Sequence, residues 1–211
     1  MEFNPDCRQC PRLARHLAAV RQDYPHYHAR PVAPFGATRP RLLIVGLAPG
    51  MHGANASGRP FTGDFAGILL YRTLYKYGFC NRPTSTSLDD GLKLKQCRIT
   101  NAVKCLPPEN KPANTEIKKC NHYLRTELDA LKSPLVVLAL GKIAHDAVLR
   151  ARDLKLSSCR FAHGAQYELT PGTWLVDSYH CSRYNTQTGR LTEKMFQNIF
   201  SKIHDILGIS S

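Results

Sequence analysis

Four short runs of apolar residues recur along the chain, each with the length and composition of a buried strand. We expect strands over residues 41–46, 98–103, 134–140 and 174–179. The first of these, RLLIVG, and the third, PLVVLAL, are continuously apolar after their first residue instead of alternating with polar positions. Strands of this kind are covered on both faces, so the pattern predicts a sheet buried between other elements.

Segments with apolar residues at helical spacing precede, separate and follow these strands. They cover residues 11–22, 64–77, 114–131, 141–150 and 191–207. The alternation predicts an α/β fold, a three-layer αβα sandwich with a central four-stranded, mostly parallel sheet. The chain has the length of one domain, which we expect to span residues 1–211. In such sheets ligands bind beyond the carboxyl ends of the strands, so the loops that follow the strands are the most informative.

Charge is the one unusual feature of the composition. The chain has 29 Lys and Arg against 16 Asp and Glu, a formal net charge of +13 at pH 7. This surplus favours a polyanionic partner, either nucleic acid or an anionic membrane surface, over a generally basic protein. No apolar run approaches the ~20 residues that cross a bilayer, and the N-terminal residues lack a signal-peptide pattern. We therefore expect an intracellular, cytoplasmic protein.

Eight cysteines are present, and in a reducing compartment they are not expected to form a disulfide framework. Cys7 and Cys10 form a C-x-x-C pair, while Cys105 and Cys120 flank a proline-rich loop. Four thiolates from these segments could bind either zinc or an iron–sulfur cluster. The alternative is that Cys105 and Cys120 belong to the core, since Cys120 falls on an apolar helical stripe. The remaining cysteines are expected to be packing residues: Cys80, Cys97, Cys159 and Cys181.

Side chains capable of chemistry gather in the loops that follow the predicted strands. The first loop is rich in glycine, which lets the backbone approach a ligand closely. It holds Phe61, an aromatic face for stacking, and Asp64, a carboxylate that can position a water. Near the end of the second strand, Asn101 offers the donors and acceptor that suit the edge of a nucleobase. After the last strand, His180 could donate a hydrogen bond to a leaving group.

Each of these residues also has a structural interpretation. Phe61 can be a core residue, Asn101 a turn residue, and a lone histidine is more often structural than functional. For Asp64 taken alone, the role of helix N-cap is favoured. The glycine-rich loop has neither the dinucleotide-binding pattern nor the P-loop pattern, so no nucleotide cofactor is indicated.

Taken together, the three loops closely resemble those of the uracil-DNA glycosylase superfamily, and most nearly its iron–sulfur type-5 branch (UDGb). The resemblance extends from Cys7 to about Gly189. It is carried by GLAPGMHGANASGRPFTGD (46–64), TNAVKC (100–105) with PPENKP (107–112), and SYHCSRYNTQTG (178–189).

The resemblance implies a role for each matching residue. Phe61 would stack on the base, Asn101 would read its edge, and His180 would be the active-site histidine. Gly46 and Ala48 would complete the base-binding pocket. Four thiolates would hold a structural 4Fe–4S cluster, those of Cys7, Cys10, Cys105 and Cys120.

Four positions depart from the family pattern: Ala48, Gly50, Ala56 and Cys181. Gly50 and Ala56 stand where alanine and arginine are expected. Ala48 stands where branches selective for uracil carry an acidic or amide residue, and that function is expected to shift to Asp64. Cys181 stands where proline is expected in the third motif, and a proline there would stiffen the loop backbone. The apolar Ala48 leads us to expect that the pocket tolerates other deaminated bases.

The implied function is a DNA glycosylase that hydrolyses the N-glycosidic bond of uracil, and of hypoxanthine and xanthine, to initiate base excision repair. The partner is then DNA with deaminated bases, bound by a monomer that associates with the nucleoid and not with membranes. DNA would lie over the carboxyl edge of the sheet, with basic contacts from Lys104, Lys111 and Arg183. The third loop supplies the residues expected to bind DNA directly: Arg183, Tyr184 and Asn185.

Two other classes of function remain open from sequence. One is a zinc- or cluster-stabilised nucleic-acid-binding protein without catalysis. The other is an α/β enzyme that acts on a small molecule or nucleotide, which would bind DNA only weakly and with little dependence on salt.

Overall fold

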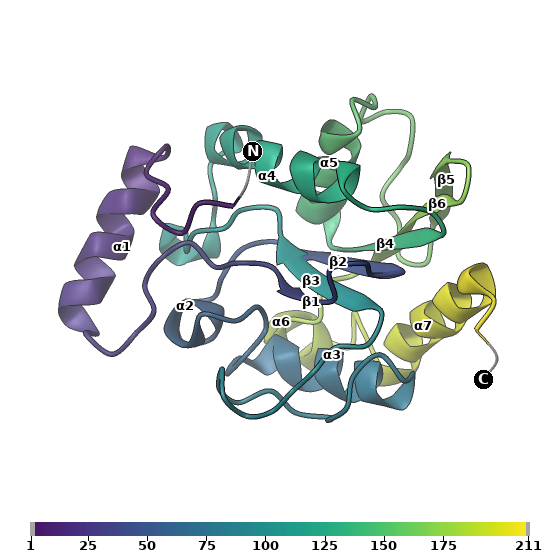
Figure 1. Cartoon of the computed structure of the whole chain (residues 1–211), viewed down its shortest axis with the longest axis horizontal. Coiled ribbons are helices and arrows are strands. Elements are labelled where there is room, and N and C mark those ends of the chain that lie inside the picture. Colours follow the sequence, from purple (N-terminus) through teal and green to yellow (C-terminus); the bar gives the residue numbers. More distant parts are fainter. Residues whose placement is uncertain (1–2, 210–211) are drawn as a thin grey trace.

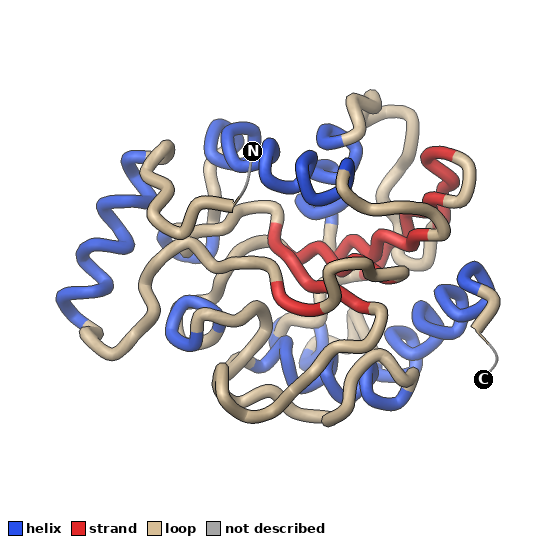
Figure 2. Tube along the Cα trace, in the orientation of Figure 1, coloured by secondary structure: helices blue, strands red, loops and turns tan. Residues whose placement is uncertain are grey.

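A six-stranded sheet forms the centre of the molecule (Figures 1 and 2). The structure, a computed structural model, describes residues 3–209. Across the sheet the strands follow the order β1 (Phe35–Gly36), β3 (Cys97–Asn101), β2 (Leu42–Gly46), β4 (Leu135–Leu140), β6 (Thr173–Ser178) and β5 (Gln166–Thr170). The four inner strands are parallel, and the two edge strands are antiparallel to their neighbours.

The inner strands correspond to the four expected from sequence, but the expected total of four was wrong. The edge strands escaped prediction for different reasons. β1 is only two residues long, so it has no readable pattern. β5 alternates between exposed and half-buried positions, with Tyr167 and Leu169 packed against the core. Its sequence, QYELT, lacks the apolar run that marked the buried strands.

Helices cover both faces of the sheet, which confirms the αβα sandwich. Along β2, Leu42 and Ile44 point toward the face that packs against α3 (Phe65–Lys76) and α7 (Glu193–Leu207). Leu43 and Val45 point to the other face, against α4 (Asn114–Asp129) and α5 (Lys142–Ala151). Because successive strand side chains alternate in direction, one continuously apolar strand supplies both cores.

A third apolar cluster lies beside the sandwich, where α1 (Pro11–Asp23) packs on the loop that follows β3 and on α4. Figure 1 shows α1 at one side of the molecule, away from the sheet. The side chains of Arg12 on α1 and Glu116 on α4 form a bidentate ion pair, with nitrogen–oxygen distances of 2.8 and 2.7 Å. The N-terminal segment is thereby joined to a helix about a hundred residues further along the chain.

Three short helices complete the described elements: α2 (Ala54–Ser57), the 3₁₀ helix η1 (Pro108–Asn110) and α6 (Arg183–Gln187). They lie in the loops after β2, β3 and β6 respectively. Within residues 3–209, no helix combines the length and apolar character needed to cross a membrane.

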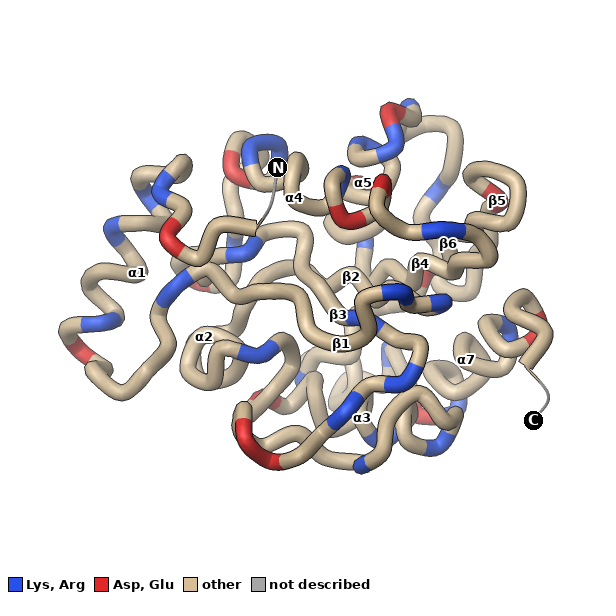
Figure 3. Tube along the Cα trace, in the orientation of Figure 1, with Lys and Arg blue, Asp and Glu red and all other residues tan. Residues whose placement is uncertain are grey.

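Lys and Arg residues occur along the whole chain and are not confined to one element (Figure 3). The expectation that Lys104 contacts DNA was wrong. Its side chain is only 1% exposed, and its Nζ donates to Glu127 Oε1 at 2.6 Å and to Thr100 Oγ1. A lysine paired in this way braces the end of β3 against α4. Lys111 and Arg183 are exposed, as a contact with DNA would require.

Candidate active site

The loops after β2, β3 and β6 enclose a cavity of about 430 Å³ at the carboxyl edge of the sheet. Five of the residues singled out from sequence line it together: Ala48, Phe61, Asp64, Asn101 and His180. They come from positions up to 132 residues apart in the sequence, and parallel strand polarity brings them to one edge.

Gly46 is the last residue of β2; it does not line the cavity itself and lies behind two of these side chains. A Cβ placed there would lie 2.4 Å from Asn101 Oδ1 and 2.8 Å from Phe61 Cζ. Both distances are well inside normal contact, so only glycine allows these side chains to approach the strand. Gly46 acts through what it leaves room for, because it brings no side chain to the cavity.

Phe61 is held in a left-handed backbone conformation, with φ of 56°. The turn is fixed from below, because the Tyr71 hydroxyl donates to the Pro60 carbonyl at 2.7 Å. It also fits closely on α3, where a Cβ at Gly67 would lie 1.9 Å from the Phe61 carbonyl oxygen. The Phe61 ring stacks with that of His180 at a centroid distance of 5.9 Å. Phe61 is therefore both a buried residue and a wall of the cavity.

Asn101 ends β3 opposite Gly46 and is 3% exposed. Its amide oxygen is buried and has no hydrogen-bond partner within residues 3–209. A buried polar atom without a partner costs about 1–3 kcal/mol, so such atoms are rare in folded proteins. Because this oxygen belongs to a residue that lines the cavity, a ligand with an N–H donor would satisfy it.

Asp64 combines the two roles that the sequence left open. It is the N-cap of α3, where its Oδ1 accepts from the Gly67 backbone N–H at 2.8 Å. It also lines the cavity, with Oδ2 on the side of Gly53, where a Cβ would lie 2.8 Å from it. Burial raises the pKa of Asp64, and backbone hydrogen bonds from Gly67 and Ala66 oppose that rise.

His180 follows β6, and burial lowers its pKa to about 4. The imidazole is therefore neutral at physiological pH and carries one N–H that can be donated. The backbone of His180 is braced, because the Asn185 amide donates to its carbonyl oxygen at 2.8 Å. Cys181 is fully buried in the core behind this loop, as expected for a packing cysteine.

The three residues expected to bind DNA have different environments. Tyr184 is 70% exposed at the surface of α6. The Arg183 guanidinium lies over the Phe65 ring, 5.2 Å from its centroid. Asn185 is half-buried and its amide is engaged with the His180 carbonyl, so the structure gives it a bracing role. Contact of these residues with DNA stays a prediction.

Several lining residues were not predicted from sequence, among them Phe65 and Asn110. Phe65 is the first residue of α3, directly after the Asp64 cap, and its position could have been read from that cap. Asn110 follows Glu109 in the proline-rich loop, and both have left-handed backbones with φ of 56° and 54°. The sequence offers a weaker signal there, because asparagine tolerates this conformation better than most residues do.

The four cysteines of the expected cluster all belong to, or pack against, the apolar cluster between α1 and α4. Burial raises the pKa of Cys105 to about 12, and the nearby thiols of Cys120, Cys7 and Cys10 add to that rise. Cys120 Sγ accepts a hydrogen bond from the Lys104 backbone N–H at 3.3 Å. The donor set and its apolar setting suit a thiolate-bound group.

As they stand, no three or more His, Cys, Asp and Glu side chains of residues 3–209 form an arrangement that could hold a metal ion. The four other cysteines are buried and free, which confirms them as packing residues: Cys80, Cys97, Cys159 and Cys181.

The fold is an αβα sandwich, and at the carboxyl edge of its sheet a cavity combines an aromatic ring, a carboxylate, a neutral imidazole and an unpaired amide oxygen. Comparison with known proteins shows the family to which this architecture belongs. A family model described as the uracil DNA glycosylase superfamily matches residues 33–204. The chain therefore belongs to the uracil-DNA glycosylase superfamily.

The chain is similar to curated type-5 uracil-DNA glycosylases over nearly its whole length. It is 43% identical to that of Thermus thermophilus, with 96% of this chain and 94% of the relative covered. It is 42% identical to that of Mycobacterium leprae, with 96% and 92% covered. The type-4 uracil-DNA glycosylase of Archaeoglobus fulgidus is 32% identical over 64% of this chain and 60% of its own. The likeness to the type-5 branch expected from the loops is confirmed.

Among solved structures, the chain resembles SMUG2 of Pedobacter heparinus, with a TM-score of 0.52 and 11% sequence identity. The match covers 100% of this chain and 94% of the other. At this identity it supports the fold alone.

Proposed function

We propose that the protein hydrolyses the N-glycosidic bond between uracil and deoxyribose in DNA, leaving an abasic site. The observation that carries this proposal is the buried, unpaired amide oxygen of Asn101 beside the stacked rings of Phe61 and His180. Uracil presents an N3–H donor that would satisfy this oxygen. Cytosine presents an acceptor at that position, which would leave the oxygen unpaired. The type-5 relatives carry the same activity in their names.

A base that is stacked within a duplex cannot reach the inside of this cavity. The nucleotide must therefore rotate out of the double helix. Flipping costs a few kcal/mol and is easiest at a mismatch, which favours uracil opposite guanine. Once flipped, the base contacts the Phe61 face and the Asn101 edge.

Bond cleavage requires charge to be stabilised on both fragments. The bond between C1′ and N1 breaks with its electron pair passing to the base, and a water oxygen forms the new bond to C1′. The neutral His180 donates its N–H toward the base oxygen where negative charge develops. Asp64, once ionised, orients the water and stabilises positive charge on the sugar; the water's proton leaves to the carboxylate or to solvent.

The substrate range is proposed to extend to hypoxanthine and xanthine. Ala48 brings only a methyl group to the cavity wall, so no polar group there rejects a larger deaminated base. A site discriminates strongly only when a mismatched ligand leaves buried polar groups unpaired.

A structural 4Fe–4S cluster is proposed on Cys7, Cys10, Cys105 and Cys120. This proposal is supported by their common position in one apolar cluster between α1 and α4. When bound, the cluster would join the N-terminal segment to the loop after β3. The adjacent backbone N–H of Lys104 would continue to donate to the Cys120 sulfur.

The test is alkaline cleavage of labelled duplexes that contain one uracil, hypoxanthine or xanthine. We expect strand breaks at uracil after alkali, and slower breaks at the other two bases. Intact uracil duplexes would refute the glycosylase proposal, and excision of uracil alone would refute the wider range. Iron and sulfide analysis of the purified protein tests the cluster separately, since zinc in their place would contradict it.

A further inference from the structure

A second cavity, of about 560 Å³, adjoins the catalytic cavity. It lies between the start of α3 and the loop that follows that helix, which runs through residues 83–86. Asp64, Phe65 and Arg183 line both cavities. The Arg183 guanidinium rests over the Phe65 ring, so this pair stands at the boundary between the two. A ligand that fills the first cavity and extends past this pair would therefore enter the second cavity.

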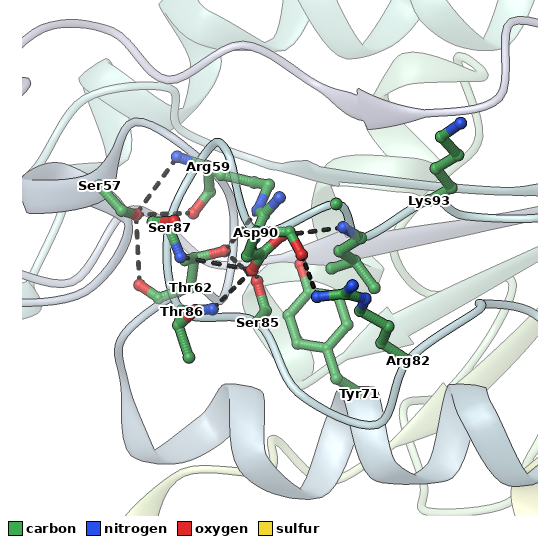
Figure 4. Close-up of polar contacts among 12 residues, drawn as sticks. Ser57, Arg59, Thr62, Tyr71, Arg82, Ser85, Thr86, Ser87, Asp90 and Lys93 are labelled. Carbon is green, nitrogen blue, oxygen red and sulfur yellow. Dashed lines mark hydrogen bonds and ion pairs between the residues drawn. The ribbon is translucent and has the colours of Figure 1, made fainter.

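The loop of residues 83–86, which forms one wall of this cavity, is held in place by contacts with the buried Arg59 (Figure 4). Arg59 is 2% exposed and forms an ion pair with Asp90. Its Nη2 also donates to Ser85 Oγ at 2.7 Å, and its Nε donates to Thr62 Oγ1 at 2.9 Å. Because Arg59 lies two residues before Phe61, one side chain fixes both the base-stacking turn and the loop over α3.

Asp90 closes the same loop from its far end. Its carboxylate accepts from the backbone N–H groups of Thr86 at 2.8 Å, Ser87 at 3.3 Å and Leu92 at 2.9 Å. Burial alone would raise the pKa of Asp90, but the hydrogen bonds from Arg59 and these amides hold it well below its usual range. Its negative charge is therefore compensated by groups of the protein. The loop is held in one conformation, and the compensated charge of Asp90 would repel an anion in the cavity only weakly.

The second cavity has one acidic lining residue, Asp64, whose Oδ1 is held by the Gly67 backbone N–H. The other groups that face this cavity suit a sugar–phosphate chain. Thr84 and Thr86 are exposed, and the structure gives their hydroxyls no hydrogen-bond partner within residues 3–209. Two cations, Arg72 and Arg183, supply charge. Arg72 reaches only a loose, exposed contact with Glu193 at 4.0 Å, which is worth little in water. Ile68, with its side chain exposed on α3, offers an apolar surface for the sugar.

We propose that this second cavity binds the sugar–phosphate backbone of the nucleotide next to the flipped one, on the same DNA strand. The inference rests on the proposed function, since it takes its direction from a base seated in the catalytic cavity. Phosphate contacts of this kind fix the position of a strand without reading its sequence. The site would hold the strand in register while the base is out of the duplex.

Binding is measured with a labelled duplex that carries one tetrahydrofuran abasic analogue, which the enzyme cannot cleave. Arg72→Ala is expected to weaken binding about 5-fold and to reduce the slope of log affinity against log salt by about 1. The double variant Thr84→Val/Thr86→Val keeps the side-chain shape and removes only the hydroxyls, so a loss of about 3- to 10-fold with an unchanged slope is expected. Lys76→Ala is the matched control, because it removes a charge one turn along α3, outside this cavity.

A second arm identifies which neighbour is held. Single-stranded substrates are prepared with the uracil at the 5′ end, at the 3′ end or internal. The native enzyme is expected to excise uracil less efficiently when the nucleotides on one side of it, 5′ or 3′, are missing. In Arg72→Ala, nucleotides on that side should no longer increase the efficiency, while the effect of nucleotides on the other side should be unchanged. Native affinity and slope in both cavity variants, or equal losses in Arg72→Ala and Lys76→Ala, would overturn the inference.

The two proposals fail in distinguishable ways. If the native protein leaves uracil in DNA, the proposed function falls, while the abasic-analogue binding arm still reports on the cavity. If the native protein excises uracil and every cavity variant keeps the native affinity and salt slope, only the second site falls.

Discussion

Two cavities lie at opposite edges of the same sheet, and the larger one is not the candidate active site. The cavity at the amino edge has about 830 Å³, against about 430 Å³ at the carboxyl edge. In the larger cavity two of the polar side chains secure the main chain of the protein itself. Arg41 donates to the Leu207 carbonyl, and the His204 ring contacts the Tyr77 carbonyl oxygen at 3.1 Å. These contacts secure the end of α7.

The smaller cavity differs because one of its buried polar atoms is unsatisfied. Asn101 presents an amide oxygen without a partner in residues 3–209, and His180 has been desolvated to a neutral imidazole. Both features cost stability in the free protein, and a bound base would recover part of that cost. Volume is therefore a poor guide to function in this fold. Strand polarity and unsatisfied polar groups distinguish the two edges.

The largest effects are expected from the two residues that act on charge in the reaction. His180→Ala and Asp64→Ala should each lower the single-turnover rate of uracil excision by about 10²- to 10³-fold. Lys95→Ala, at the amino edge, should leave the rate unchanged. Near-native rates for His180→Ala and Asp64→Ala would contradict the assignment of the carboxyl-edge cavity as the active site.

The second effect concerns the ion pair that supports the carboxyl edge. Asp90→Ala leaves the buried Arg59 without its counter-charge, and the free energy of unfolding should fall by about 3 kcal/mol. Urea denaturation followed by tryptophan fluorescence measures this change. Asp89→Ala, the exposed neighbour, is the control and should change stability little. If the two variants are equally stable, the loop of residues 83–86 does not depend on this pair.

The third effect tests the close packing behind the site. Gly46→Ala would push a methyl group against Asn101 and Phe61, and a displacement near 1 Å should lower the excision rate by about 10- to 100-fold. Gly78→Ala is the control at the other cavity, where no atom lies within 4 Å of a new Cβ. Gly78→Ala should lower the free energy of unfolding, because Gly78 has a φ of 75°. It should leave the excision rate unchanged. Equal rates in both variants would contradict the packing argument.

The smallest expected effect is a shift along the pH axis. Asp64 must be ionised to orient water, and its pKa is raised by burial. The rate should therefore rise with pH through a value above the usual aspartate range and then stay level. No step is expected near pH 6.5, because the pKa of His180 is lowered to about 4. A single-turnover pH profile measures this, and Asp64→Asn should lack the acid limb. A fall in rate as His180 loses a proton near neutral pH would show that the charged imidazole is the active form.

Much of the fold was readable because its inner strands are buried on both faces. Short apolar runs, continuous in β2 and β4, identified the four inner strands β2, β3, β4 and β6. The helical stripe of Phe196, Ile199 and Ile203 identified α7. The edge strands were not readable, since β1 is too short and β5 is half-exposed. Their pairing is decided by tertiary contacts that a local pattern does not contain.

The candidate site divides in a similar way. Phe61, Asp64, Asn101 and His180 were found because they lie at or beyond the carboxyl ends of strands, and parallel topology brings these strand ends together at one edge. The incorrect prediction for Lys104 has a different origin, because the net charge of a chain does not show where each charged side chain lies. Its side chain turned inward to Glu127, which no count of charges reveals. The internal use of the Asn185 amide was hidden for the same reason.

The most direct test of the central claim is the release of free base from a duplex with uracil opposite guanine, measured for the native protein and for Asn101→Ala. The native protein is expected to release uracil and leave an abasic strand. Asn101→Ala should do so at least about 10-fold more slowly, since the N3–H of the base would lose its acceptor. Absence of free uracil with the native protein, or an equal rate with Asn101→Ala, would contradict the assignment of this cavity as the base-binding site.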